Sequence, residues 1–315
     1  MSAQSKSTLT NKNLSVLLNK RSIKINNTGK KYEQEKYLRS ERKIAGGDIV
    51  FVVIGERINT SRKRVREAVA ERDAAFIRED VLKQENAGVS YIDVNAGARI
   101  SHEMDDMKWL IEVIQEVVTV PLCLDSPDPK VLEMAYGMSK KPPMINSISL
   151  EKNRYNIMMP FLEGKQCSVL ALCMGDSGMP KNAAQVIDRA KRLVQELENI
   201  GMNREGIYVD PLVQPVSTES TNGIMAREAV AAIMQELPGV HTTCGLSNIS
   251  FGLPVRKRVN RIFLTLMMAS GLDTAIADPL DHELMTAIKI AEVLLGKDEY
   301  CRRYLRAYRA GRISK

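Results

Sequence analysis

The sequence has few residues of the kinds that build metal sites or disulfide frameworks. Of its 315 residues only three are histidine and five are cysteine, and no two cysteines are spaced as Cys-x-x-Cys. Three of them, Cys123, Cys173 and Cys244, lie in apolar runs typical of strands, so we expect reduced core thiols in a cytoplasmic protein. The histidines have no spacing typical of a zinc site, and we therefore expect no protein-bound metal.

Long apolar runs are also missing. The sequence has no unbroken apolar stretch of membrane-spanning length and no apolar N-terminal segment followed by small residues. We therefore expect no membrane association and no secretion by that route. The Gly-x-Gly-x-x-Gly motif typical of open dinucleotide-binding sheets is absent as well, which counts against a doubly wound fold.

The positive charge of the chain is concentrated near its ends. The net charge is +7, and residues 1–45 hold eleven Lys or Arg against three Glu, so the rest of the chain is nearly neutral. A second basic run occupies 302–315. Basic ends on a neutral body favour solvated tails over a nucleic-acid site, so we expect no nucleic-acid partner. Residues 1–45 are interpreted as a basic N-terminal extension, either a loosely packed arm or a docking arm for an acidic partner.

From residue 46 onward, short apolar segments alternate with segments of helical periodicity. The expected strands lie at 49–54, 89–94, 120–124, 144–147, 168–173, 207–209, 240–246 and 274–277. The expected helices lie near 64–87, 105–117, 128–138, 151–163, 182–199, 224–236, 256–270 and 281–295. Eight strands alternating with eight helices predict an α/β fold, a TIM (β/α)8 barrel, over residues 46–315. Glycines 88, 164, 201, 239 and 271 stand where these helices should end.

Polar residues recur where the expected strands end. They include Asp93, Asn95, Asp125, Asn146, Asp210 and Asn248. In a parallel barrel these positions fall on the C-terminal rim, where catalytic groups of that fold lie. A carboxylate beside an amide can hold a planar heterocycle that presents a ring N–H next to an exocyclic amine. Asp125, Asn146 and Asp210 therefore predict a site that fits the pyrimidine edge of a pterin.

Several motifs occur in a characteristic order. They are Gly55-Glu56-Arg57-Ile58-Asn59, Asp93-Val94-Asn95, Leu122-Cys123-Leu124-Asp125-Ser126, Met144-Ile145-Asn146-Ser147, Tyr208-Val209-Asp210-Pro211-Leu212 and Gly245-Leu246-Ser247-Asn248-Ile249-Ser250. In these motifs the chain resembles the pterin-binding methyltransferases that move a methyl group between methyltetrahydrofolate and a corrinoid protein. The resemblance covers roughly residues 50–305, and Asn260-Arg261 and the segment 271–278 fit it too.

The resemblance implies roles for individual residues. The substrate-binding set would be Asp125, Asn146 and Asp210, which hold the pterin, with Asn95, Asp93, Glu56, Asn59 and Arg256 around them. Asn248 would be the catalytic amide that approaches the methyl-bearing ring nitrogen. Arg256 falls at the position of an arginine of the family, although the sequence of the surrounding segment 253–258 departs from the family's usual motif. Asp278 is read first as a turn cap before proline, and only second as a ligand residue.

Two other functions remain as alternatives. Dihydropteroate synthases share the pterin-binding barrel, but their Asp-Ser-Phe-Ser-Asp-Gly stretch is missing, and the first rim loop here contains Arg57-Ile58-Asn59-Thr60-Ser61-Arg62-Lys63. A non-catalytic pterin-binding subunit of a corrinoid complex would keep Asp125 and Asn146 but would not need Asn248.

The resemblance also implies partners. No Asp-x-His-x-x-Gly signature of a cobalamin domain occurs, so the cobalamin would be carried by a separate corrinoid protein, while tetrahydrofolate or methyltetrahydrofolate is the substrate. Barrels of this family pair, so a homodimer is expected. The apolar segment 262–268 either contributes to that contact or packs on the barrel wall. The direction of methyl transfer is left open.

Overall fold

The computed structural model describes residues 43–44 and 48–313. The extension expected at residues 1–45 therefore lies outside the described part of the chain, apart from its last strand residues. A short antiparallel pair joins β1 (Lys43–Ile44) to β2 (Asp48–Ile49). The basic extension and its docking role stay predictions.

Eight parallel strands form the sheet of a barrel within the described residues, in the order β10-β3-β4-β5-β6-β7-β8-β9. Their bounds are β3 Val52–Asn59, β4 Tyr91–Asn95, β5 Leu122–Asp125, β6 Met144–Leu150, β7 Ser168–Gly175, β8 Ile207–Asp210, β9 His241–Thr242 and β10 Thr274–Ala277. A parallel bridge between Gly245 and Ile276 brings the two ends of the sheet together, and the Ile276 amide donates to the Cys244 carbonyl at 2.9 Å. The expected TIM barrel is confirmed.

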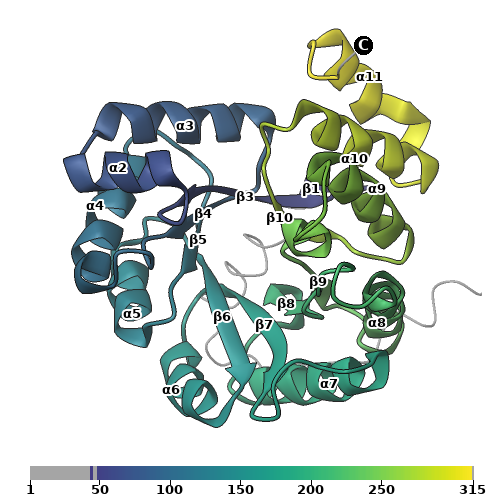
Figure 1. The fold of residues 1–315 in the computed structure, drawn as a ribbon, viewed down its shortest axis with the longest axis horizontal. Helices are drawn as coiled ribbons and strands as arrows, with labels where there is room; N and C mark the ends of the chain where they lie inside the picture. Colours follow the sequence, from purple (N-terminus) through teal and green to yellow (C-terminus); the bar gives the residue numbers. More distant parts are fainter. Residues whose placement is uncertain (1–42, 45–47, 314–315) are drawn as a thin grey trace, which may run out of the picture. The chain divides into compact units, whose positions relative to one another are not determined.

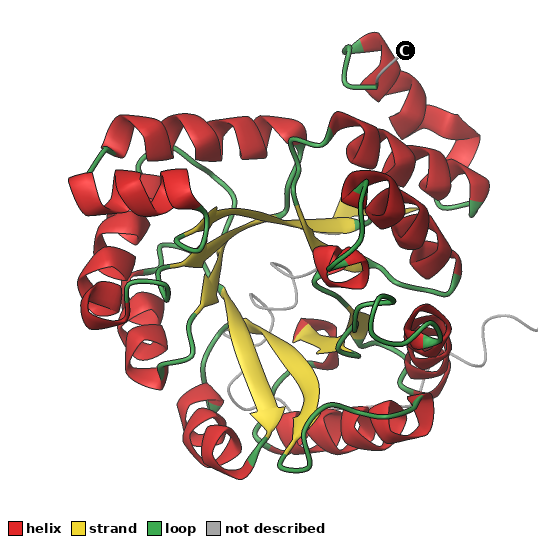
Figure 2. Cartoon of the chain, viewed as in Figure 1, coloured by secondary structure: helices red, strands yellow, loops and turns green. Residues whose placement is uncertain are grey.

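Helices surround the strands on the outside (Figures 1 and 2). Their bounds are α2 Lys63–Glu71, α3 Ala74–Ala87, α4 Glu103–Gln115, α5 Pro129–Met138, α6 Lys152–Leu162, α7 Ala183–Asn199, α8 Asn222–Glu236, α9 Arg256–Ala269, α10 His282–Leu294 and α11 Arg302–Arg309. None of the helices in the described part of the chain is long and apolar enough to cross a membrane.

Side chains alternate along each strand between the core under the helices and a smaller cluster inside the barrel. In β4, Ile92 and Val94 point outward and join the large core under the helices, whereas Tyr91 belongs to a smaller cluster inside the barrel. Cys123 and Met144 belong to this inner cluster, and so do the other inward apolar residues of neighbouring strands. Because the period of a strand is two, Asp93 and Asn95 point inward as Tyr91 does. The inner apolar layer thus ends in polar side chains at the rim.

The main differences between the structure and the expected elements concern four segments. The expected helix 64–87 is two helices, because Arg72 is left-handed with φ of 57° and Asp73 caps α3 by accepting from the Phe76 amide at 3.1 Å. The first strand extends to Asn59, five residues further than expected, so Glu56 lies within it. The strand expected over 240–246 is short, and the 3-10 turn η3 (Leu246–Ser250) follows it. The basic run after residue 301 contains α11 rather than a plain tail.

Other expectations about local structure are confirmed. All five glycines expected at helix ends have positive φ, from 71° at Gly164 to 112° at Gly271. The five cysteines are free thiols, and four of them are buried, among them Cys123, Cys173 and Cys244. Burial raises the pKa of the Cys167 thiol to about 12, so this side chain is an unreactive core residue at neutral pH.

Candidate pterin site at the barrel rim

Three polar residues on three consecutive strands stand at the same level of the rim. Asn95 of β4 is the register partner of Asp125 of β5, and Asp125 is the register partner of Asn146 of β6. Asn95 Nδ2 donates to Asp125 Oδ2 at 2.7 Å, while Asn95 Oδ1 accepts from the Gly97 amide at 2.9 Å. The amide of Asn95 is therefore fixed in orientation and holds one carboxylate oxygen of Asp125.

A cavity of about 450 Å³ opens beside Asp125 and Asn146. It is lined by Glu56, Asn59, Ser61, Arg62, Asp93, Asp125, Asn146, Ser247, Arg256 and Ile276. The structure thus brings together six residues that were candidates from the sequence, contributed by β3, β4, β5, β6 and the start of α9. Such a depression at the carboxyl ends of barrel strands is the usual place for a ligand in this fold.

Asp93 is the most deeply buried carboxyl group of the cavity. Burial raises its pKa well above the usual range, and the neighbouring Asp125 carboxylate raises it further. Its Oδ1 atom is buried and has no hydrogen-bond partner among the described residues. A buried acceptor of this kind is costly unless a donor completes it. A ligand with N–H groups would supply that donor.

Burial raises the pKa of Asp125 as well, although the hydrogen bond from Asn95 and the charge of Arg154 oppose this shift. Arg154, on α6, donates to the carbonyl of Ser126 at 3.1 Å and to that of Ser147 at 2.7 Å. It therefore joins the segments that follow Asp125 and Asn146, and it supplies a nearby positive charge. The sequence motifs gave no signal for Arg154, because it lies on a helix outside them.

Glu56 and Asp278 form a second acidic group at the rim. Burial, followed by the charge of Asp278, raises the pKa of Glu56 to about 7. Asp278 accepts from Arg57 Nη1 at 3.0 Å and from the Leu280 amide at 3.0 Å. It thus caps its turn as expected, and in addition it forms an ion pair. Arg57 also donates to Asp80 of α3 at 2.8 Å, so it connects α3 with the loop after β10.

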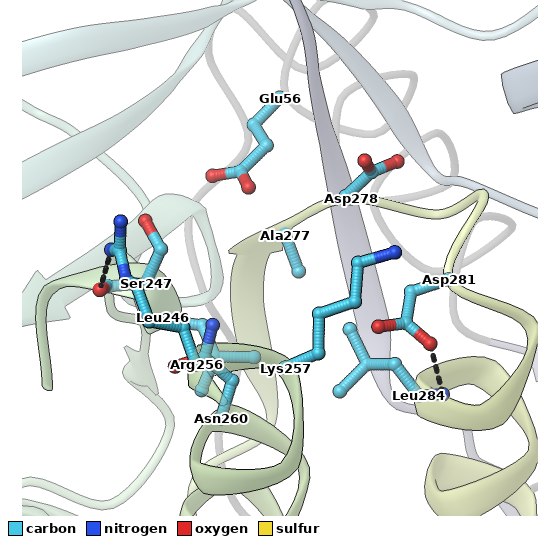
Figure 3. A pocket seen from close by; sticks show the side chains of 10 residues that line it. All are labelled: Glu56, Leu246, Ser247, Arg256, Lys257, Asn260, Ala277, Asp278, Asp281 and Leu284. Carbon is cyan, nitrogen blue, oxygen red and sulfur yellow. Dashed lines mark hydrogen bonds between the residues drawn. The ribbon is translucent and has the colours of Figure 1, made fainter. Parts of the chain in front are cut away.

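Arg256 stands at the border of a second cavity. Its guanidinium donates to the Ser247 carbonyl at 2.7 Å and to Ser250 Oγ at 3.1 Å. The second cavity, of about 310 Å³, shares Glu56, Ser247 and Arg256 with the first one and extends between η3, α9 and α10 (Figure 3). The two cavities therefore adjoin along the rim.

Three candidate residues are absent from the lining of both cavities: Asn95, which contacts the cavity residue Asp125, and also Asp210 and Asn248. Asp210 is buried at the end of β8, where its Oδ1 accepts from the Leu212 amide at 2.7 Å, and burial raises its pKa to about 7. Asn248 is exposed on η3, directly after Ser247. A Cβ atom on Gly245 would lie 3.1 Å from Asn248 Nδ2, so the side chain of Asn248 folds back over that glycine.

The part of the chain that the structure describes contains no candidate metal site. No group of three or more His, Cys, Asp or Glu side chains there could hold a metal ion. The rim carboxylates are instead surrounded by amide and guanidinium groups such as Asn95, Asn146 and Arg62.

Comparisons with known proteins agree with this geometry. Residues 55–278 match the family described as pterin binding enzyme. The chain is 37% identical to a methylcorrinoid:tetrahydrofolate methyltransferase of Eubacterium limosum over 265 residues, which is 84% of this chain and 98% of that protein. It is also 30% identical to a methionine synthase of Mycobacterium tuberculosis over 242 residues, 73% of this chain but 20% of that larger protein.

Solved structures show the same fold. One is a dihydropteroate synthase of Xanthomonas albilineans in complex with 7,8-dihydropteroate. The match covers 78% of this chain and 93% of that chain, with a TM-score of 0.58 and 17% sequence identity. At that identity the likeness concerns the fold alone. The family match and the Eubacterium limosum relative confirm the resemblance found in the sequence motifs. The chain belongs to the pterin-binding enzyme family.

Proposed function

We propose that the protein is a methyltransferase that moves a methyl group between methyltetrahydrofolate and the cob(I)alamin of a separate corrinoid protein. The observation that supports this most is the row Asn95, Asp125 and Asn146, which strand register aligns and of which Asp125 and Asn146 line the cavity. The Eubacterium limosum relative, which matches this chain over 98% of its own length, is named for transfer between a methylcorrinoid and tetrahydrofolate.

The residues of the cavity fit a pterin. The ring N–H and the exocyclic amine are adjacent donors. Asp93 Oδ1, which has no partner among the described residues, and the Asp125 carboxylate, which lines the cavity, are acceptors for them. Asn146 offers one donor and one acceptor for the neighbouring ring atoms. Asp210 lies further round the barrel, and its role in holding the pterin is part of the proposal.

Methyl transfer needs a stabilised leaving nitrogen. The bond from N5 to the methyl carbon breaks with its electron pair remaining on N5, a bond to cobalt forms with the pair that cob(I)alamin supplies, and N5 takes up a proton. In the proposed mechanism the Asn248 amide donates a hydrogen bond at N5 and positions the protonated nitrogen. Donation of this kind contributes roughly 10²–10⁴ in rate when it is well placed. Because the same transition state serves both directions, the site supports transfer to or from the folate.

Asn248 reaches this position from an exposed turn. Ser247 lines both cavities and Asn248 follows it directly, and the side chain of Asn248 lies against Gly245. Its exposure also suits a reaction in which the methyl acceptor arrives on the surface of another protein. The corrinoid partner would then approach the open rim.

A homodimer and a cytoplasmic location are further parts of the proposal. In the segment 262–268, Phe263, Leu264, Met267 and Met268 pack in the core, whereas Ile262 and Leu266 are 64% and 44% exposed. The helix therefore packs on the barrel and still presents an apolar strip. Light scattering of the wild type and Ile262→Glu tests the pairing, because a monomeric wild type would contradict it.

The proposed activity is tested by anaerobic incubation with methyltetrahydrofolate and reduced free cobalamin. We expect the cob(I)alamin absorbance to decay while methylcobalamin forms. Intact folate binding without any methylcobalamin would instead support the non-catalytic subunit. Condensation of a pterin pyrophosphate with an aromatic amine would support the dihydropteroate synthase alternative.

A further inference from the structure

The second cavity has its own chemistry, distinct from that of the pterin cavity. Its lining combines apolar side chains with charged ones, and Figure 3 shows them facing a common space between η3, α9 and α10. The lining residues outside the shared border are Leu246, Lys257, Asn260, Ala277, Asp278, Asp281 and Leu284. Since the cavity begins where the pterin cavity ends, a ligand that is longer than a pterin could occupy both.

The two acidic residues that line only this cavity already have cationic partners. Asp278 is bound by Arg57 at 3.0 Å. Asp281 is bound by Arg261 at 2.7 Å, and it also caps α10 by accepting from the Leu284 amide at 3.1 Å. Neither carboxylate therefore needs a cation from the cavity, and each contributes little net negative charge to a ligand there.

The cationic residues of the cavity lack such partners. Neither Arg256 nor Lys257 has a carboxylate within ion-pair distance among residues 48–313, and the hydrogen bonds of Arg256 go to Ser247 and Ser250. In Figure 3 the Lys257 side chain extends across the cavity from the first turn of α9. Two unpaired cations beside neutralised acids favour an anionic ligand group.

Asn260 gives a second and independent indication of a ligand. The residue lines the cavity, and its Oδ1 atom is buried and has no hydrogen-bond partner among the described residues. An unsatisfied buried amide oxygen requires an N–H donor. Leu246 and Leu284 lie on the same walls and offer apolar contact to a flat group.

We propose that this second cavity binds the p-aminobenzoylglutamate part of the folate, with Lys257 as its specificity-determining residue. The aromatic ring packs against Leu246 and Leu284, the amide N–H donates to Asn260 Oδ1, and a glutamate carboxylate pairs with Lys257 beside Arg256. This inference rests on the proposed function, since it assigns the remainder of the same substrate. Lys257 lies in the segment 253–258, whose sequence departs from the family's usual motif.

The test compares two ligands, one with the tail and one without it. Calorimetry measures the affinity of the full chain for tetrahydrofolate and for 6-methyltetrahydropterin, which keeps the pterin and lacks the tail. Lys257→Gln should weaken tetrahydrofolate binding by about threefold to tenfold and leave 6-methyltetrahydropterin unchanged, because a single exposed charge pair is lost. Asn260→Ala should show the same selectivity.

The matched control is Lys108→Gln, an exposed lysine on α4 outside both cavities, which should bind both ligands as the wild type does. Equal affinity of the wild type and Lys257→Gln for tetrahydrofolate would overturn the tail site. Loss of 6-methyltetrahydropterin binding in Lys257→Gln would overturn it too, since the tail is absent from that ligand. A wild type that binds neither ligand would contradict the proposed function itself.

Discussion

The side-chain amide of Asn95 donates to one carboxylate oxygen of Asp125 at 2.7 Å, and the two residues are register partners on adjacent strands. Asp125 lines the cavity, and the Gly97 amide fixes Asn95 in turn. Asn95 is therefore a positioning residue for Asp125, whatever else it contacts.

Substitution of Asn95 should weaken folate binding through Asp125. We expect Asn95→Ala to lower tetrahydrofolate affinity by about tenfold, because one charge-assisted hydrogen bond is lost. Asn95→Asp should lower it further at pH 7, since a second carboxylate beside Asp125 raises the pKa of both groups. The loss in Asn95→Asp should diminish when calorimetry is repeated at lower pH. Wild-type affinity in both variants would contradict the positioning role.

Glu56 should make the stability of the protein depend on pH. Its folded-state pKa of about 7 lies above the ordinary value of 4.5, so folding favours its protonated form. The stability that it contributes is fully present below pH 4.5 and is lost as the pH rises through 7. The free energy of unfolding of Glu56→Gln, relative to that of the wild type, should therefore increase as the pH rises from 4.5 to 7. The difference should reach about 3 kcal/mol above pH 7.

Urea unfolding of the wild type and Glu56→Gln at several pH values measures this difference. Asp210, whose pKa is also about 7, is present in both proteins, so its contribution cancels in the comparison. A difference that stays constant from pH 4.5 to pH 8 would show that the Glu56 carboxyl group is not shifted.

Gly245 should be needed for the position of Asn248. Its φ of −71° is one that alanine adopts without strain, but the added Cβ would lie 3.1 Å from Asn248 Nδ2. We expect Gly245→Ala to slow methyl transfer by about tenfold to a hundredfold, because a displaced donor loses its alignment with the reacting nitrogen. Tetrahydrofolate affinity should change little.

Gly137→Ala on α5 is the matched control, since nothing lies within 4 Å of the Cβ it would add. Stopped-flow measurement of transfer should give the wild-type rate for this variant. An undiminished rate in Gly245→Ala would argue that the side chain of Asn248 is free to move or takes no part.

Arg57 should contribute strongly to stability. It pairs with Asp80, whose side chain is only 7% exposed, and with Asp278. Arg57→Gln leaves the buried Asp80 without a cation and leaves Asp278 only the longer pair with Arg62 at 4.0 Å, and we expect the free energy of unfolding to fall by roughly 3 kcal/mol. Arg64→Gln, which breaks an exposed pair with Asp73, should cost less than about 1 kcal/mol. Equal losses in thermal unfolding would contradict the distinction.

Much of the fold and part of the site could be predicted from the sequence. Asp125 and Asn146 follow apolar runs directly, and parallel register places the ends of adjacent strands side by side, so their convergence needed no further information. The glycines at the helix ends were recognisable for a similar local reason. The split between α2 and α3 was not, because left-handed Arg72 carries no glycine signal.

Features that depend on packing between distant segments could not be predicted from the sequence. The exposure of Asn248 depends on the short η3 turn, and the pairing of Asp278 with Arg57 joins residues at opposite ends of the barrel sequence. The second cavity likewise combines η3, α9 and α10. Periodicity along the chain is a local property and does not report such contacts.

The most direct test follows an isotopically labelled methyl group in a single turnover from methyltetrahydrofolate to cob(I)alamin. The wild type should transfer the label to cobalamin. Asp125→Ala should lose affinity for the folate by on the order of 100-fold, because two charge-assisted contacts to the pterin disappear. Failure of the wild type to label cobalamin, or an Asp125→Ala variant that binds and transfers as the wild type does, would contradict the account.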